Sequence, residues 1–286
     1  MFRTLWRHRE LILSLVKRDL KTRYKGSALG FLWSLCRPLF IMAVLFVVFV
    51  VIVPLRFENS YFPNPLDPAR ERIAFGVHLI IGILIWNFFA GALSESTGAI
   101  LVNGNLIKKI KVPLEVFPVV TVLSHLIHLA LAMAVAIPVI LLLGFKITWL
   151  ALTLPLVIAL LVILATGLAF FLSATNVFYR DVASLTEIVL LAWFYVTPVF
   201  YPANVAFVEL KKHSIVFFWA FVANPMATLC IAARRVLFVD GNFERREAAD
   251  ETFWKYLLLC AATSLVVYGV GRLVFRRLSP RFADEV

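Results

Sequence analysis

Long apolar runs recur along this chain, and they constrain its fold more than any other feature. Crossing a bilayer as a helix takes about 20 mainly apolar residues. Runs of about this length lie at residues 31–53, 76–97, 118–143, 149–174, 184–201 and 253–274. Hydrophobic residues make up 62% of the chain and charged residues 16%, against about 45–50% and about 25% in a soluble domain. The sequence therefore predicts an all-α membrane protein with six transmembrane helices, and it argues against a soluble enzyme or a disordered chain.

A further apolar stretch, residues 215–231, is interrupted by Asn224 and Pro225. A proline inside a helix removes a backbone hydrogen bond and breaks or kinks the helix. We interpret the stretch as two half-helices that dip into the membrane and return, forming re-entrant segments between the fifth and sixth spans. Broken helices of this kind occur where protein or a wet cavity surrounds them. The alternative is a true additional span, which would place the C-terminus on the opposite side.

The distribution of basic residues predicts the orientation. With six spans, both termini share one side with the loops at 98–117 and 174–183, and that side carries more Lys and Arg. Cytoplasmic loops are enriched in basic residues, so we expect both termini in the cytoplasm. The opposite side then holds two segments, a proline-rich stretch at 54–75 that predicts irregular structure and a mixed-charge stretch at 232–252. The net charge of +11 fits topology and anionic headgroups better than nucleic acid.

The N-terminal segment predicts an amphipathic helix over residues 10–25, because apolar residues recur there every three or four positions. The stripe consists of Leu11, Ile12, Leu15, Val16, Leu20 and Tyr24. Such a helix is typical of the membrane interface, although a simple basic flank that directs insertion is the alternative. The two glycines that follow permit a sharp turn, whose exposed N–H groups and basic neighbours could bind a lipid phosphate. The candidate residues are Arg23, Lys25, Gly26, Leu29, Gly30, Trp33 and Arg37.

The loop after the second span predicts a short cytoplasmic helix. Asn105 is a suitable N-cap, and Pro113 would end the helix. Its apolar and basic faces suggest a docking site for a partner protein, and a solvated basic loop is the alternative. The candidate contacts are Asn105, Leu106, Ile107, Lys108, Lys109, Ile110 and Lys111.

Residues 192–202 are unusually rich in aromatic residues and contain two prolines. Aromatic rings that line a passage can stack against the apolar faces of sugars, whereas a Tyr and Trp belt at the membrane interface is the competing interpretation. The candidate channel residues are Trp193, Phe194, Tyr195, Phe200 and Tyr201.

Motifs for other chemistry are absent from the sequence. It has no phosphate-cradling G-x-x-x-x-G-K-[ST] loop and no H-E-x-x-H motif, so we expect no catalytic residues, metal site or cofactor in this chain. Its three cysteines predict no disulfide framework. His125 and His128 share one helix face, where interhelical hydrogen bonding is favoured over metal binding or proton relay. Glu95 is an intramembrane acid, which makes it a functional candidate or a structural contact.

Several of these segments together resemble a known family. The run from Arg18 to Trp33 is similar to the opening of type-2 ABC transporter permeases that export bacterial polysaccharides, in particular O-antigen and teichoic-acid permeases. Weaker similarities lie at Asn105 to Pro118, Asn176 to Asp181, Pro198 to Pro202, Asn224-Pro225 and Ser279 to Phe282.

The resemblance implies an export permease in the bacterial inner membrane, with no enzymatic activity of its own. Two permeases would pair with two separate ATPase subunits, which use ATP and Mg²⁺ to drive a lipid-linked polymer outward. Residues 1–30 would form the interface helix and turn at the lipid-head site, and residues 31–286 a single transmembrane domain. The helix around 105–112 would couple to the ATPase, and residues 203–231 would form outer gate helices. An exporter of drugs or lipids is the main alternative. A membrane enzyme or an ion-coupled carrier is disfavoured, since clustered acids and a Ser/His/Asp set are not visible.

Overall fold

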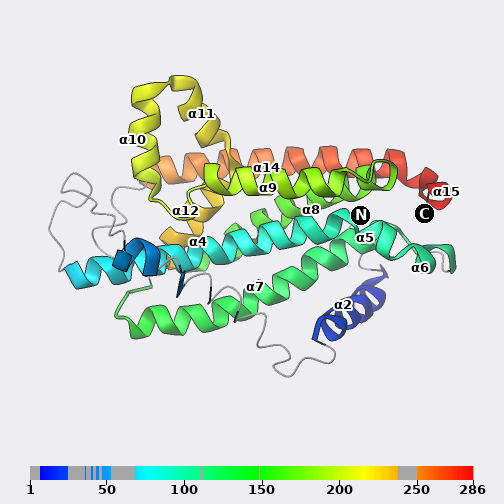
Figure 1. Cartoon of the computed structure of the whole chain (residues 1–286), viewed down its shortest axis with the longest axis horizontal. Helices are drawn as coiled ribbons and strands as arrows, with labels where there is room; N and C mark the ends of the chain where they lie inside the picture. Colours follow the sequence, from blue (N-terminus) through cyan, green and yellow to red (C-terminus); the bar gives the residue numbers. More distant parts are fainter. Residues whose placement is uncertain are drawn as a thin grey trace.

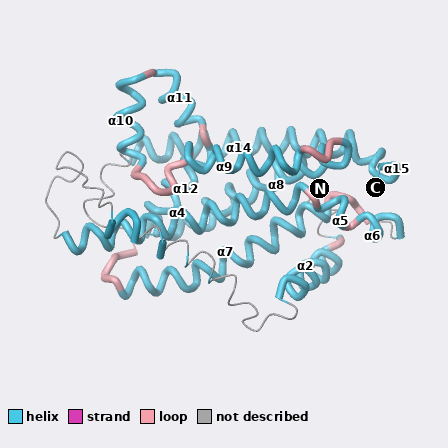
Figure 2. The backbone as a smooth tube through the Cα atoms, in the orientation of Figure 1, coloured by secondary structure: helices cyan, strands magenta, loops and turns pink. Residues whose placement is uncertain are grey.

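The computed structural model describes residues 7–24, 36, 40, 43–44, 47–52, 68–109, 112–147, 149–237 and 250–285. This part of the chain is built from helices that run mostly along one axis (Figures 1 and 2). The long helices are α4 (Pro68–Thr97), α7 (Val116–Leu142), α8 (Leu154–Phe178) and α14 (Asp250–Leu278). The shorter α-helices are α2 (Arg9–Tyr24), α5 (Ala99–Val102), α6 (Gly104–Lys109), α9 (Val182–Val196), α10 (Ala203–His213), α11 (Ile215–Ala223), α12 (Pro225–Leu237) and α15 (Phe282–Glu285). Single turns of other helix types are η2 (Val47–Ile52), η3 (Trp149–Thr153) and η4 (Ser279–Arg281).

The described residues include four helices that are long and apolar enough to cross a membrane. They are Ile73–Thr97, Val116–Leu142, Leu150–Phe178 and Phe253–Arg281. Helices α11 and α12 would make a fifth span if taken together, although they bend by 67° at Asn224. The chain is thus a multi-pass membrane protein. The first span predicted from the sequence, residues 31–53, lies largely outside the described residues.

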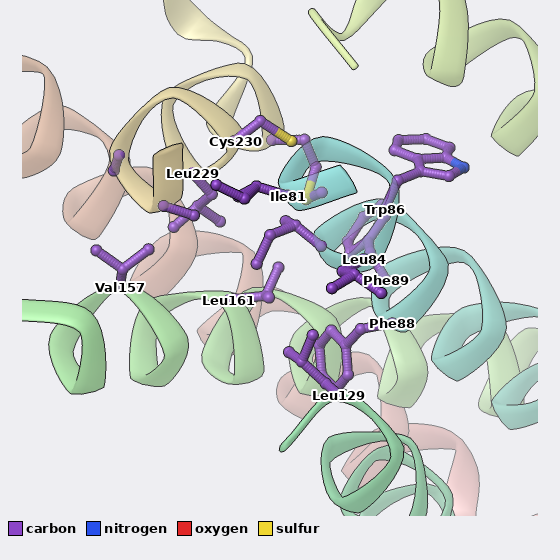
Figure 3. Close-up of a cluster of buried hydrophobic side chains, with 14 of the residues drawn as sticks. Ile81, Leu84, Trp86, Phe88, Phe89, Leu129, Val157, Leu161, Leu229 and Cys230 are labelled. Carbon is purple, nitrogen blue, oxygen red and sulfur yellow. The ribbon is translucent and has the colours of Figure 1, made fainter. Parts of the chain in front are cut away.

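Helix α4 forms the centre of the bundle and is the most buried of the four long helices. It packs against α7 on one side and against α8, α9 and α12 on the other. Figure 3 shows its Ile81, Leu84 and Phe89 among side chains from α7, α8 and α12. This position explains why the central part of α4, residues 73–93, is mainly apolar on every face.

The two ends of the bundle carry different elements. Helices α2, α5, α6 and α15 lie at one end, together with the turn between α8 and α9 (Figure 1). The opposite end holds the turn between α7 and η3, the start of α4, and the pair α10–α11, which stands out from the bundle (Figure 1). This arrangement matches the grouping of loops that the charge distribution predicts.

The sequence prediction is wrong at three boundaries. Residues 68–75 belong to α4, although the sequence predicts irregular structure over 54–75; α4 begins at Pro68, and proline is well tolerated in the first turn of a helix. The fifth apolar run does not continue to Tyr201, because α9 ends at Val196 ahead of Pro198. Residues 232–237 belong to α12 and are buried, although the sequence predicts an outside loop there.

Candidate functional site

The N-terminal helix α2 confirms the amphipathic helix predicted from the sequence. Its Ile12, Leu15 and Val16 are buried in a cluster with residues of α5, α7, α8 and α14. Lys17, Lys21 and other basic side chains remain exposed. The apolar stripe is therefore partly used for packing against the protein itself, which the sequence alone did not indicate.

The predicted lipid-head residues Lys25, Gly26, Leu29, Gly30, Trp33 and Arg37 lie outside the described residues. Arg23 lies in the last turn of α2, but its side chain is also outside them. These assignments stay predictions.

A hydrogen bond joins α2 to the turn between α5 and α6. The Arg18 Nη2 atom donates to the Asn103 side-chain oxygen at 2.8 Å, while the Asn103 side-chain nitrogen, Nδ2, donates to the Ala99 carbonyl at 2.9 Å. The backbone carbonyl of Asn103 accepts hydrogen bonds from the amides of Leu106 and Ile107. Asn103 therefore ties α2, α5 and α6 into one local unit.

The helix predicted at residues 105–112 exists as α6, but its start differs from the prediction. Asn105 is inside the helix, and the preceding Asn103 supplies the carbonyl at its N-terminus. Leu106 and Ile107 pack against the buried cluster of α2 and α7, whereas Asn105 and Lys108 are exposed. Lys109 ends the helix, its side chain is not described, and Ile110 and Lys111 lie outside the described residues. Val102 on α5 is 84% exposed, so this end of the bundle presents both apolar and basic groups.

The aromatic residues of α9 divide between the core and the surface. Trp193 packs edge-on against Phe89, with ring centroids 5.2 Å apart, and Phe194 packs against Trp86 at 5.5 Å. Tyr195 remains 60% exposed. The aromatic character of α9 thus serves two purposes, packing on α4 and presenting rings at the surface of this chain.

The chain between α9 and α10, residues 197–202, is called the aromatic turn here. Phe200 lies against Tyr201, with ring centroids 5.1 Å apart. The Tyr201 hydroxyl lies 3.3 and 3.2 Å from the carbonyls of Tyr195 and Val196, to which it can donate. The turn therefore folds back over the end of α9 and satisfies carbonyls that a helix end leaves unpaired.

Asn224 organises the break between α11 and α12. Its side-chain oxygen accepts hydrogen bonds from the Trp193 indole nitrogen at 2.9 Å and from the Met226 amide at 3.0 Å. Its amide nitrogen donates to the Thr197 hydroxyl at 3.3 Å. The side chain thus caps α12, which begins with Pro225, and also binds the end of α9. The break predicted at Asn224 is confirmed, and the re-entrant path of the two half-helices stays a prediction.

Arg234 is a buried charged residue that the sequence interpretation misses, since it places this residue in an outside loop. Its side chain is 2% exposed and donates to the carbonyls of His78, Pro198 and Val199. A buried charge is stable only where polar partners replace its hydration. Arg234 thereby connects α12, α4 and the aromatic turn.

Glu95 and His125 form a second polar contact inside the bundle. The His125 Nε2 atom lies 3.0 Å from the Glu95 carboxylate, and the His125 ring occupies the space beside Gly91. The two atoms are close, but they are not aligned for a hydrogen bond, and His125 Nε2 has no hydrogen-bond partner among the described residues. His128 packs against His125 with ring centroids 6.1 Å apart. His125 thus makes a close interhelical polar contact with Glu95 of α4 in place of the interhelical hydrogen bond that the sequence predicts.

Among the described residues no group of three or more His, Cys, Asp or Glu side chains could hold a metal ion. The polar contacts described above join helices to one another and to the aromatic turn. They are suited to holding helices in register.

A sequence profile of the ABC-2 type transporter family matches residues 10–238, which is most of the chain. The chain belongs to the ABC-2 type transporter family. The match begins in α2 and ends just after α12, so it contains most of α2, α6, the aromatic turn and the Asn224 break.

Known relatives of this ABC-2 transporter cover almost its full length. The O-antigen export system permease protein RfbA of Myxococcus xanthus is 27% identical over 290 residues, covering 100% of this chain and 99% of that protein. A protein of the same name from Klebsiella pneumoniae is 26% identical over 277 residues, covering 96% and 94%. A second Klebsiella pneumoniae protein of that name is 25% identical over the same length.

Proposed function

We propose that this chain is the permease subunit of an ATP-driven exporter that moves a lipid-linked polysaccharide, such as an O-antigen, across the bacterial inner membrane. The observation that carries the proposal is the similarity of the whole chain to permeases named for O-antigen export. Because the similarity extends from end to end, it includes the segments that would contact substrate as well as the membrane scaffold.

The permease would work as a homodimer with two separate ATPase subunits, which bind and hydrolyse ATP with Mg²⁺. The surface formed by Val102, Asn105 and Lys108 supports this pairing, because it combines an exposed apolar group with a basic one at a single end of the bundle. All three side chains are exposed, so a partner subunit could reach them. We assign this surface to the ATPase.

The ATPase surface, α2 and α15 would face the cytoplasm, since all lie at the same end of the bundle (Figure 1). The pair α10–α11 at the opposite end would then be the outer gate, and residues 31–53 would complete six spans. An export route would begin at the lipid-head residues 25–37 and pass the aromatic residues of α9 and the aromatic turn. Phe200 and Tyr201 could stack on sugar rings there, because stacking tolerates different sugars.

Export of a drug or a lipid is the second candidate, since the ABC-2 family assignment does not by itself choose the substrate. A deletion in the native host separates the two candidates. Loss of the surface polysaccharide with accumulation of the lipid-linked polymer inside the cell is the expected result, restored by a plasmid copy of the wild-type chain. Unchanged surface polysaccharide together with increased drug sensitivity would contradict the proposal.

A further inference from the structure

The aromatic turn that follows α9 contains backbone carbonyls that accept hydrogen bonds from Arg234. Thr197 is extended, with φ −90° and ψ 135°, as expected for a residue before proline. The chain leaves the helix there, so backbone carbonyls of the aromatic turn lack helical partners. In a membrane protein each buried, unsatisfied carbonyl is costly, so these groups need donors from elsewhere in the fold.

The turn itself satisfies only some of these groups. The Thr197 carbonyl accepts from the Val199 amide, and the Tyr201 hydroxyl covers the last carbonyls of α9. The carbonyls of Pro198 and Val199 accept from Arg234, at 2.5 Å from Nη1 and 2.6 Å from Nη2. The two guanidinium nitrogens thus bind two consecutive carbonyls at once.

The third contact fixes the guanidinium on α4. The Arg234 Nε atom donates to the His78 carbonyl at 3.1 Å, and the His78 Nε2 atom lies 3.3 Å from the Tyr201 carbonyl. Gly82 makes room for this approach, because a Cβ atom there would overlap the Arg234 Nη2 atom and lie 2.7 Å from the Val199 oxygen. The aromatic turn is therefore hydrogen-bonded to α12 through Arg234 and to α4 through His78.

Arginine suits this position better than lysine. Its planar fork presents donors in fixed directions, whereas a lysine ammonium is a single point of charge on a flexible stem. A lysine at position 234 could not reproduce three donors on three carbonyls that belong to two separate segments. The neighbouring Arg235 differs, since it lies over the Phe253 ring at 4.5 Å and contacts α14 instead.

We propose that Arg234 is a positioning residue for the polysaccharide path, which holds the aromatic turn, and with it Phe200 and Tyr201, against α4 and α12. The inference rests on the proposed function, because it assigns the turn a place along the export route. Loss of the Arg234 hydrogen bonds would let the rings of the turn move while the helices of the bundle stay packed. Export would then become less efficient for each ATP hydrolysed.

The test compares the wild-type chain with Arg234→Lys, Gly82→Ala and the control Arg235→Lys, each assembled with its ATPase in nanodiscs. Gly82→Ala removes the space for the guanidinium while keeping its charge, so it reaches the same contact by an independent route. Hydrogen–deuterium exchange of residues 197–202 measures how often the aromatic turn opens, and exchange in α8 measures how often the helix bundle opens. Polymer transported per ATP hydrolysed reports coupling.

We expect Arg234→Lys and Gly82→Ala each to speed exchange in the turn by about tenfold, since they lose hydrogen bonds to a charged donor. They should lower the amount of polymer transported per ATP by about fivefold, a factor that corresponds to the free energy of about one hydrogen bond. The exchange rate of α8 should stay unchanged. Arg235→Lys should stay near wild type in all three measurements. Wild-type exchange and coupling in both Arg234→Lys and Gly82→Ala, or equal effects in Arg235→Lys, would overturn the proposal.

Faster exchange in α8 as well would show that Arg234 stabilises the whole protein, and this result would also overturn the proposal. The exchange measurement does not depend on the substrate. If the wild-type chain moved no polysaccharide, the proposed function would fail, while the exchange data would still decide whether Arg234 holds the turn.

Discussion

Gly271 of α14 lies directly against the carbonyl group of Gly167 of α8, so closely that neither position has room for a side chain. A Cβ on Gly167 would lie 2.5 Å from the Tyr268 α carbon, and one on Gly271 would overlap the Gly167 carbonyl. Small residues at such crossings let membrane helices approach closely, where van der Waals packing stabilises the pair. This contact joins the last long helix to α8, which itself packs against the central helix α4.

Gly271→Val should therefore destabilise the protein by about 3 kcal/mol or more, because overpacking a tight contact forces backbone shifts. Gly269→Val is the matched control, since it lies two residues away and a Cβ atom there would meet no other atom within 4 Å. Thermal unfolding in detergent measures both. Equal melting temperatures for the two variants would contradict the packing argument.

Trp193→Phe should weaken the contact between α9 and the Asn224 break while preserving an aromatic ring. The substitution removes the donor to the Asn224 oxygen, a loss of about 1 kcal/mol. Asn224→Ala should cost about 2 kcal/mol or more, because it also removes the cap of α12. Thermal unfolding of the two single variants and the double variant gives the coupling energy, and Trp219→Phe at an exposed site is the control. Strictly additive effects would argue against the bond.

Val102→Asp and Lys108→Glu should each reduce co-purification of the ATPase, since both change exposed groups on the proposed docking surface. Val102→Asp should be the more severe, because it places a charge where an apolar contact is expected. Lys17→Glu, an exposed charge reversal on α2, is the control for a general loss of basic charge. Normal ATPase binding by both test variants would place the docking surface elsewhere.

Asn103→Ala should reduce export more than Arg18→Ala does. Both substitutions break the link between α2 and α6, but Asn103→Ala also removes the hydrogen bond to the Ala99 carbonyl. The link is exposed, so we expect about 1 kcal/mol or less from it, visible as a reduced export rate at normal protein levels. Lys21→Ala, one turn along α2, should have no such effect. A Lys21→Ala variant as impaired as Asn103→Ala would indicate a role for basic charge instead.

The turn that the sequence predicts at residues 25–30 leads to a separate prediction about the lipid head. Lys25→Ala should lower export modestly, because a basic group near the membrane surface contributes about 1 kcal/mol to headgroup binding. Gly30→Val should be worse if the turn needs positive φ, which β-branched residues avoid. A photoreactive lipid-pyrophosphate analogue should label positions 25–33 and be displaced by unlabelled substrate. Export without labelling there would show that the lipid head binds elsewhere.

The sequence by itself determined the helical membrane scaffold. The long apolar runs predicted α4, α7, α8 and α14 to within a few residues at most ends, because a chain in a bilayer must satisfy its backbone groups within each span. The Asn224-Pro225 step predicted the break before α12 for an equally local reason. Helix α2 followed from its three- and four-residue spacing. In each case the deciding interaction lies within a few residues along the chain.

Only the tertiary structure decided how the polar residues are used. Arg234 reads as a loop charge in the sequence, and its partner His78 lies 156 positions away. Glu95 and His125 read as isolated groups, yet they meet across α4 and α7. Arg18 and Asn103 join segments 85 positions apart. A buried charge is stabilised by donors and acceptors close to it in space, and a local sequence pattern does not specify which distant groups those are.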